Sequence, residues 1–178
     1  MSEIHLDQMR KILKSQYHAA LAMLRETIER CPDDVWFRDE QKNSFWQIEY
    51  HALFFTHVYL QPSEAAFRPW EHHQGNVQNE DAFAIEKDPK SNLPLLPKPY
   101  TKAEVLAYWN FCDQMVDRAI DALDLQSPES GFHWYKFSKL EHQIMNIRHI
   151  EHHTAQLADR LRSTSGIAIR WVGSKGEV

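Results

Sequence analysis

Residues 148–157 read RHIEHHTAQL, and this stretch decides how the rest of the chain is interpreted. The apolar residues in and around it recur at helical spacing, so that one arc of a helix collects Ile147, Ile150, Leu157 and Leu161. His149 and His153 are four residues apart, which places them about 40° apart around the helix and one turn apart along it. The two histidines therefore flank the apolar arc and border the interior of the protein.

The helix that contains this stretch is predicted to run from about residue 138 to residue 163. Ser138 followed by Glu141 is a capping box, the pattern that starts many helices. Gly166 then breaks the chain. The apolar segment that follows, IAIRWV (167–172), is short and rich in β-branched residues, and we expect it to pack back on the protein as an extended segment.

Three earlier segments have the same helical period, and they predict helices near 3–30, 44–61 and 101–125. Pro32 ends the first of them. Ser44 is a suitable N-cap for the second, which is apolar on most sides and should be well buried. Thr101 with Glu104 forms a capping box at the start of the third.

The connection over residues 62–100 is too long for a tight turn. It holds six of the eight prolines of the chain. Loops of this size are uncommon inside compact domains and are often functional. The sequence therefore predicts an all-α fold, a four-helix bundle with an up-down-down-up path and one long crossover between its second and third helices.

The composition of the chain excludes several classes of protein. A length of 178 residues predicts one domain, over residues 1–178. A net charge of −5 gives no basic surface for nucleic acid, and two cysteines cannot form a disulfide scaffold or a cysteine-rich zinc site. There is no glycine-rich phosphate loop, no signal-peptide core and no run of about 18 apolar residues, so we expect a cytoplasmic protein without a membrane partner.

His51 is the best candidate for a third ligand beside His149 and His153. Its helical neighbours Ile48 and Phe55 are apolar, so its polar ring needs a partner. That partner is either a backbone carbonyl or a metal ion shared with the pair at 149 and 153. Imidazole nitrogens bind zinc at about 2.1 Å, and the three histidines together predict such a site. The alternative for the pair is a solvated, histidine-rich helix face.

Other polar residues are candidates for supporting roles. Gln156 lies one helical turn after His153 and can hydrogen-bond a ligand or be an ordinary surface glutamine. Asp113 can orient a ligand imidazole or be solvated. His142 is about 10 Å along the helix from His149, too far for the same ion, and we expect it to be solvated. Cys112 lies within an apolar stripe and is expected to be a buried, inert thiol.

The set of residues resembles the DinB-like superfamily. The resemblance rests on a histidine in the second helix, His51, and on HxxxH followed closely by Gln-Leu in the last long helix of a four-helix protein of this size. The superfamily includes YfiT-like hydrolases and thiol-dependent S-transferases. Its pattern often has glycine before the glutamine, where this chain has Ala155.

The resemblance implies a bundle that holds a divalent ion, zinc or nickel, in a three-histidine site. His51, His149 and His153 take the ligand positions of the family. Better-understood relatives use a low-molecular-weight thiol, such as bacillithiol or mycothiol, as cosubstrate. Fold and site transfer through such a resemblance better than the reaction does.

Three function classes follow from this site. Neutral imidazoles leave the ion its full charge and an open position, which can activate a thiolate or a hydroxide. The protein is accordingly a metal-dependent thiol S-transferase acting on small electrophiles, a metal-dependent hydrolase, or a metal-binding stress-response protein without catalysis. We expect Phe55, Tyr59 and Trp109 to form an apolar wall beside the site.

The expected partner is a small-molecule substrate. Arg148 and Arg160 are the arginines considered for a charged thiol, with solvation as the alternative. The sequence leaves the oligomeric state open, and a homodimer is the assembly considered.

Overall fold

The computed structural model describes residues 3–38, 43–75, 77–78 and 98–177. Its helices are α1 (Glu3–Arg30), α2 (Asp33–Trp36), α3 (Phe45–Tyr59), α4 (Lys102–Ala122) and α5 (Lys139–Ser165), with 3-10 turns η1 (Glu64–Ala66) and η2 (Lys175–Glu177). The described residues contain no strand, so the predicted all-α fold is confirmed. The four long helices are the predicted ones, and only the four-residue α2 was not expected.

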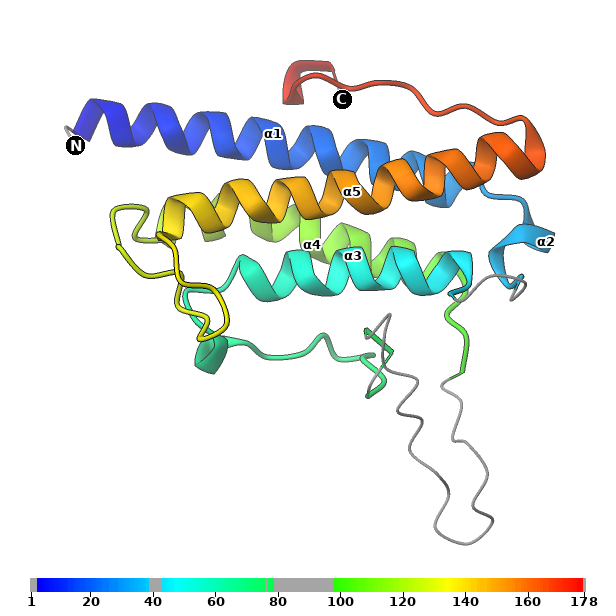
Figure 1. The fold of residues 1–178 in the computed structure, drawn as a ribbon, viewed down its shortest axis with the longest axis horizontal. Helices are drawn as coiled ribbons and strands as arrows, with labels where there is room; N and C mark the ends of the chain where they lie inside the picture. The colour runs from blue at the N-terminus through cyan, green and yellow to red at the C-terminus, as the bar shows by residue number, and fades with distance from the viewer. Residues whose placement is uncertain (1–2, 39–42, 76, 79–97, 178) are drawn as a thin grey trace, which may run out of the picture.

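The four long helices form a bundle in which α1 and α5 run in one direction and α3 and α4 in the other (Figure 1). Both α1 and α3 pack against α4 and α5. This is the predicted up-down-down-up path, with its long crossover between Tyr59 and Lys102. After η1 the chain returns along α3 (Figure 1). Three of the crossover prolines, Pro89, Pro94 and Pro97, lie outside the described residues.

Helix ends follow the local signals in the sequence. Ser44 caps α3 in a reciprocal box with Gln47, and Thr101 does the same for α4 with Glu104. Ser138 accepts a hydrogen bond from the Glu141 N–H at the start of α5. Gly166 ends α5 with a φ of 66°, in the left-handed region that glycine adopts without a steric penalty. Each cap satisfies backbone groups that the helix itself leaves unpaired.

Among the described residues, the core contains one carboxyl group, that of Glu49 on α3, which is completely buried. Thr27 Oγ1 lies 2.6 Å from the Leu24 carbonyl oxygen and 2.5 Å from Glu49 Oε1. A hydroxyl has one proton, so it can donate to only one of these oxygens. The second bond needs a proton from Glu49, and burial raises the pKa of Glu49 well above its usual value. Glu49 is therefore a neutral carboxylic acid.

The segment after α5 packs back along α1, as predicted (Figure 1). Val172 is buried against Ala19 and Met23. An Arg30 guanidinium nitrogen donates to the Ala168 carbonyl oxygen at 2.6 Å. The segment is extended without being a strand, because its backbone partners are side chains of α1.

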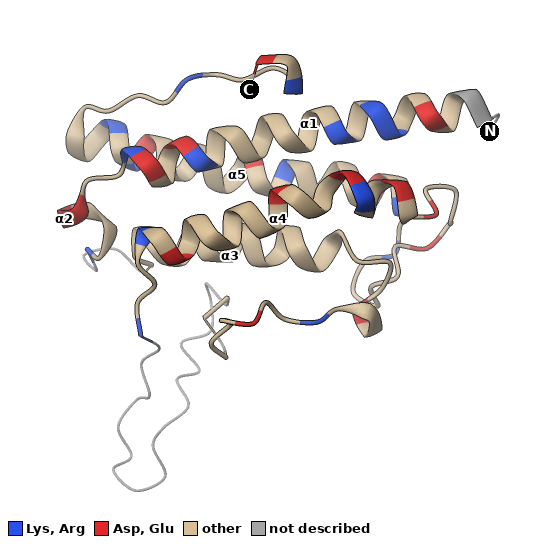
Figure 2. Cartoon of the chain, turned by 180° about the vertical axis from the view of Figure 1, so that it is seen from behind, with Lys and Arg blue, Asp and Glu red and all other residues tan. Residues whose placement is uncertain are grey.

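No described helix combines the length and the apolar character needed to cross a membrane. Acidic and basic residues alternate along the helices and do not gather by sign in the view of Figure 2. This distribution agrees with the small net charge of the chain.

Candidate metal centre

Three histidines meet at the seam between α3 and α5. His51 comes from α3, and His149 and His153 come from α5. The Nε2 atom of His149 lies 3.1 Å from Nε2 of His51 and 3.1 Å from Nε2 of His153. One ring nitrogen from each residue falls within a cluster spanning 4.8 Å, so the group can hold a metal ion. The structure thus brings together the three residues predicted as ligands.

The helical periods explain why the rings meet. In the apolar arc of α5, Ile150, Leu157 and Leu161 are fully buried in the bundle and Ile147 is half-buried. His149 and His153 lie at the edge of that arc, with His149 half-buried and His153 buried. On α3, the buried Ile48 places His51 at the matching edge. The two edges face each other because α3 and α5 are neighbours in the bundle.

Hydrogen bonds at the other ring nitrogens fix how the outer two histidines are protonated. His51 Nδ1 lies 2.6 Å from the Gln78 carbonyl oxygen, which can only accept, so Nδ1 carries the proton. His153 Nδ1 lies 3.2 Å from Gln156 Oε1. Both residues therefore present the Nε2 lone pair to the cluster. The two alternatives for His51, a carbonyl partner and a metal ion, are compatible because they use different nitrogens.

The geometry of the cluster suits a divalent cation. At a metal–nitrogen distance of about 2.0–2.1 Å, two ligands of a tetrahedral ion lie about 3.3–3.4 Å apart. The observed Nε2–Nε2 separations of 3.1 Å are close to that spacing. A proton on His149 Nε2 can form a linear bond to one neighbour and not to both, whereas one ion serves all three lone pairs. Within the described part of the chain, the buried Nδ1 of His149 has no hydrogen-bond partner.

Burial keeps the α5 histidines neutral. Desolvation, followed by the neighbouring imidazoles, lowers the pKa of His149 to about 3. Desolvation and His51 lower the pKa of His153 to about 4. Metal ligands must be deprotonated, so these rings need no proton release before they bind an ion near neutral pH.

The apolar wall beside the cluster is partly as predicted. The Phe55 ring centroid is 4.8 Å from that of His51, and the Tyr59 centroid is 6.3 Å from that of His149. The prediction for Trp109 is wrong: its indole N–H donates to the Leu21 carbonyl oxygen at the α1–α4 seam. An apolar stripe on α4 shows which side is buried but not which neighbour it faces.

His142 is also placed differently from the prediction. It is completely buried instead of solvated, in an aromatic box that includes Tyr59, Phe132 and Tyr135. Desolvation lowers its pKa to about 4. The 128–137 loop closes this box, and helical periodicity carries no information about a loop that folds over the helix end.

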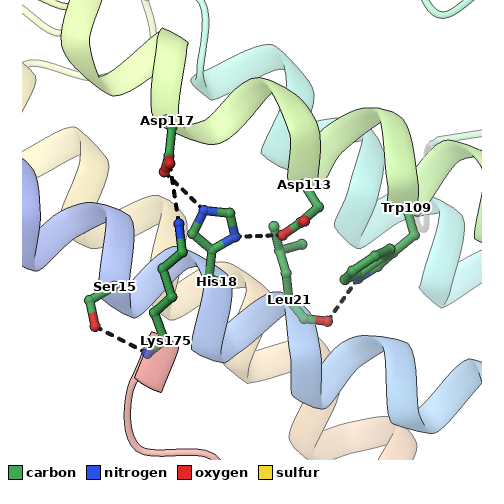
Figure 3. A network of polar contacts seen from close by, with 7 residues as sticks. All are labelled: Ser15, His18, Leu21, Trp109, Asp113, Asp117 and Lys175. Atoms are coloured by element: carbon green, nitrogen blue, oxygen red, sulfur yellow. Dashed lines mark hydrogen bonds and ion pairs between the residues drawn. The ribbon is translucent and has the colours of Figure 1, made fainter. Parts of the chain in front are cut away.

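Asp113 does not orient a ligand imidazole. It accepts from His18 Nδ1 at 2.6 Å, while Asp117 lies 2.9 Å from His18 Nε2 (Figure 3). Lys175 reaches Asp117 at 3.2 Å, and its backbone N–H donates to Ser15 Oγ. Because each nitrogen of His18 faces a carboxylate, the ring carries two protons and a positive charge. The spacing of Asp113 and Asp117 by four residues was the sequence signal for this network.

The remaining candidates have plain roles. Gln156 contacts His153, one of the three predicted ligands, while Gln78 was missed because a backbone carbonyl has no sequence signature. Cys112 is a buried free thiol, as expected. Arg148 is exposed, and Arg160 donates to the Asn43 carbonyl oxygen at 2.8 Å.

In a comparison with protein families, the model of the DinB superfamily matches residues 16–157. The matched region includes all three clustered histidines. No curated protein and no solved structure matches the chain.

Proposed function

The chain belongs to the DinB superfamily, and on that premise we propose that it binds zinc or nickel and transfers a small thiol to an electrophile. His51, His149 and His153 are the proposed ligands. The convergence of their Nε2 atoms, at 3.1 Å for two of the three pairs, is the observation that carries the proposal. A hydrolase and a non-catalytic metal protein are the alternatives that the experiments below distinguish.

The residues around the site each have a role in the proposed reaction. A bound divalent ion would supply Lewis acidity, which lowers the pKa of a thiol or a water at its open position. The neutral imidazoles leave the charge of the ion undiminished, which suits an anionic sulfur. Phe55 and Tyr59 limit the access of water to the nucleophile from one side.

The proposed reaction balances without a redox partner. The thiol loses its proton to solvent, and its sulfur forms a bond to the electrophilic carbon. The bond from that carbon to the leaving group breaks, and the group departs with the electron pair, as chloride does from an aryl chloride. The substrate class is therefore a small electrophile with a displaceable group, and the thiol class comes from the family resemblance.

The test begins with metal analysis of protein purified without a histidine tag. The same sample is then given a chromogenic aryl halide with each of several thiols, and a chromogenic ester without thiol. We expect thiol-dependent turnover by the metal-loaded protein that is lost in the metal-free protein and in His149→Ala. Ester cleavage without thiol would support the hydrolase, and metal binding without either turnover would support a non-catalytic role.

We place the protein in the cytoplasm in this proposal, acting on small molecules without nucleic acid or membrane partners. Light scattering of the metal-loaded protein tests the homodimer considered for it.

A further inference from the structure

Two described parts of the crossover, residues 72–74 and 98–100, are joined beside α3. The Gln74 side chain donates from Nε2 to the Lys98 carbonyl oxygen and accepts from the Lys98 N–H at Oε1, both at 3.0 Å. The Tyr100 hydroxyl donates to the His72 carbonyl oxygen at 2.6 Å and accepts from the Gln74 N–H at 2.9 Å. We call the Gln74 side chain, the Tyr100 hydroxyl and the backbone of residue 98 the crossover clasp.

The clasp is anchored on α3. The Tyr100 ring stacks on that of Tyr50 with centroids 4.6 Å apart and planes 9° from parallel. The Tyr50 hydroxyl in turn lies 2.7 Å from His73 Nδ1. Tyr50 is completely buried in the bundle, so these contacts connect the returning chain to the rigid core.

The returning chain ends, in its described part, at the candidate metal centre. Gln78 lies four residues after Gln74, and its carbonyl oxygen accepts from His51 Nδ1 at 2.6 Å. Val77, the residue before it, is buried. The clasp therefore holds a segment whose last described carbonyl fixes the tautomer and the direction of the His51 ring.

We propose that the crossover clasp positions His51 for metal binding, an inference that rests on the proposed metal site. Holding the Gln78 carbonyl in place keeps the proton on His51 Nδ1 and keeps the Nε2 lone pair directed at His149. Partners of this kind, which hydrogen-bond the second nitrogen of a ligand imidazole, commonly change metal affinity by about 10- to 100-fold. Gln74 and Tyr100 are positioning residues that act through the Gln78 carbonyl.

Two variants open the clasp, and two serve as controls. Gln74→Ala removes both bonds to residue 98, and Tyr100→Phe removes the hydroxyl while keeping the stacked ring. Lys98→Ala leaves the clasp intact because residue 98 contributes only its backbone. Gln61→Ala removes another glutamine that donates to a backbone carbonyl, that of His57, away from the site.

Zinc affinity is measured by competition with a chromogenic chelator. We expect Gln74→Ala and Tyr100→Phe each to weaken binding about 10-fold, and both controls to stay within twofold of the wild type. The metal-free protein supplies a second measurement, since nitrogen-15 NMR of the imidazole reports the protonation of His51 Nδ1 and the exchange of its proton. We expect faster exchange in the two clasp variants.

The outcomes separate the clasp from the metal site. If the wild type binds neither zinc nor nickel, the proposed function fails, and the clasp is judged by the exchange of the His51 proton alone. If Gln74→Ala and Tyr100→Phe keep wild-type zinc affinity and wild-type His51 exchange, the clasp does not position the ring. Circular dichroism of each variant establishes that the helices are retained.

Discussion

The α3–α5 seam and the α1–α4 seam both contain histidines, but the first favours a neutral ring and the second a positively charged one. At the α3–α5 seam, imidazoles face one another, and burial lowers the pKa of His149 to about 3. At the α1–α4 seam, hydrogen bonding to Asp113 is the largest of the effects that raise the pKa of His18. The imidazoles of the α3–α5 seam present nitrogen lone pairs, whereas the imidazole of the α1–α4 seam presents N–H groups.

This difference shows how a bundle selects a cation. Lone pairs that converge on one point favour a positive ion, and the three-histidine cluster could hold one. His18 already provides the positive charge to its two carboxylates, so it has no lone pair for a metal (Figure 3). The identity of the neighbours, and not the histidine itself, decides between a metal ligand and an ion-pair partner.

The largest effect is expected when one histidine of each seam is replaced by alanine. We expect His153→Ala to lower zinc affinity at least about 100-fold, because losing partners of a ligand already costs 10- to 100-fold. His18→Ala should leave the affinity unchanged. Chelator competition measures both, and equal affinities in the two variants would remove the distinction between the seams.

Adding metal should stabilise the folded protein through the α3–α5 seam alone. At a free zinc concentration of 100 times Kd, the free energy of unfolding should rise by about 2.7 kcal/mol. Urea denaturation with zinc and with a chelator measures the gain. His149→Ala should abolish it and Asp117→Asn should retain it; a gain that survives in His149→Ala would place the ion elsewhere.

Lowering the pH should reduce the free energy of unfolding, because a buried histidine stays neutral in the folded state. His142 tests this effect away from the proposed metal ligands. An unfolded histidine titrates near pH 6.5, whereas burial lowers the pKa of His142 to about 4. The unfolded state therefore binds more protons, and stability falls as the pH drops from 6.5 towards 4, by about 2 kcal/mol at pH 5.

The variant His142→Gln should lose this part of the pH dependence. Denaturation of the metal-free protein at pH 7.5 and pH 5 measures the slope, with the exposed His152→Gln as control. An unchanged slope in His142→Gln would mean that His142 is solvated after all.

The smallest expected effect is the contribution of His18 to stability, which decreases as the pH rises, whereas that of His142 increases. His18 has a raised pKa, so its contribution is complete below the unfolded value and is lost as the pH rises through the folded value. Asp113→Asn should therefore cost about 1 kcal/mol at pH 6 and almost nothing well above the folded pKa. Urea titrations at pH 6 and at alkaline pH measure the difference, and an equal cost at both would show that His18 is neutral.

Helical period was enough to predict what lies within one helix or at one edge of it. Spacings of three and four residues predicted the four long helices and the place of His149 and His153 beside a buried arc. The same spacings predicted the contact of Gln156 with His153. The choice of His51 also followed, because a polar ring in an apolar stripe needs a partner. The metal itself, its identity and the single domain stay predictions.

Contacts between elements were not predictable in the same way. Trp109 was expected at the site, but α4 is diagonal to α5 in the bundle. An apolar stripe does not identify the helix against which it packs. His142 depends on a loop, and Gln78 acts through a backbone carbonyl that every residue possesses. His18 and Asp113 meet across 95 residues of sequence, so the spacing of Asp113 and Asp117 does not identify the ring that binds between them.

The buried acid of Glu49 and the charged ring of His18 also decide how the protein exchanges protons with its buffer. The sequence counts a net charge of −5 with histidines neutral, but each of these groups carries one proton more in the folded state. Unfolding at a pH above the ordinary pKa values of these groups therefore releases protons. The calorimetric enthalpy of unfolding should consequently differ between phosphate and Tris, whose ionisation enthalpies differ, and Glu49→Gln should reduce that buffer dependence.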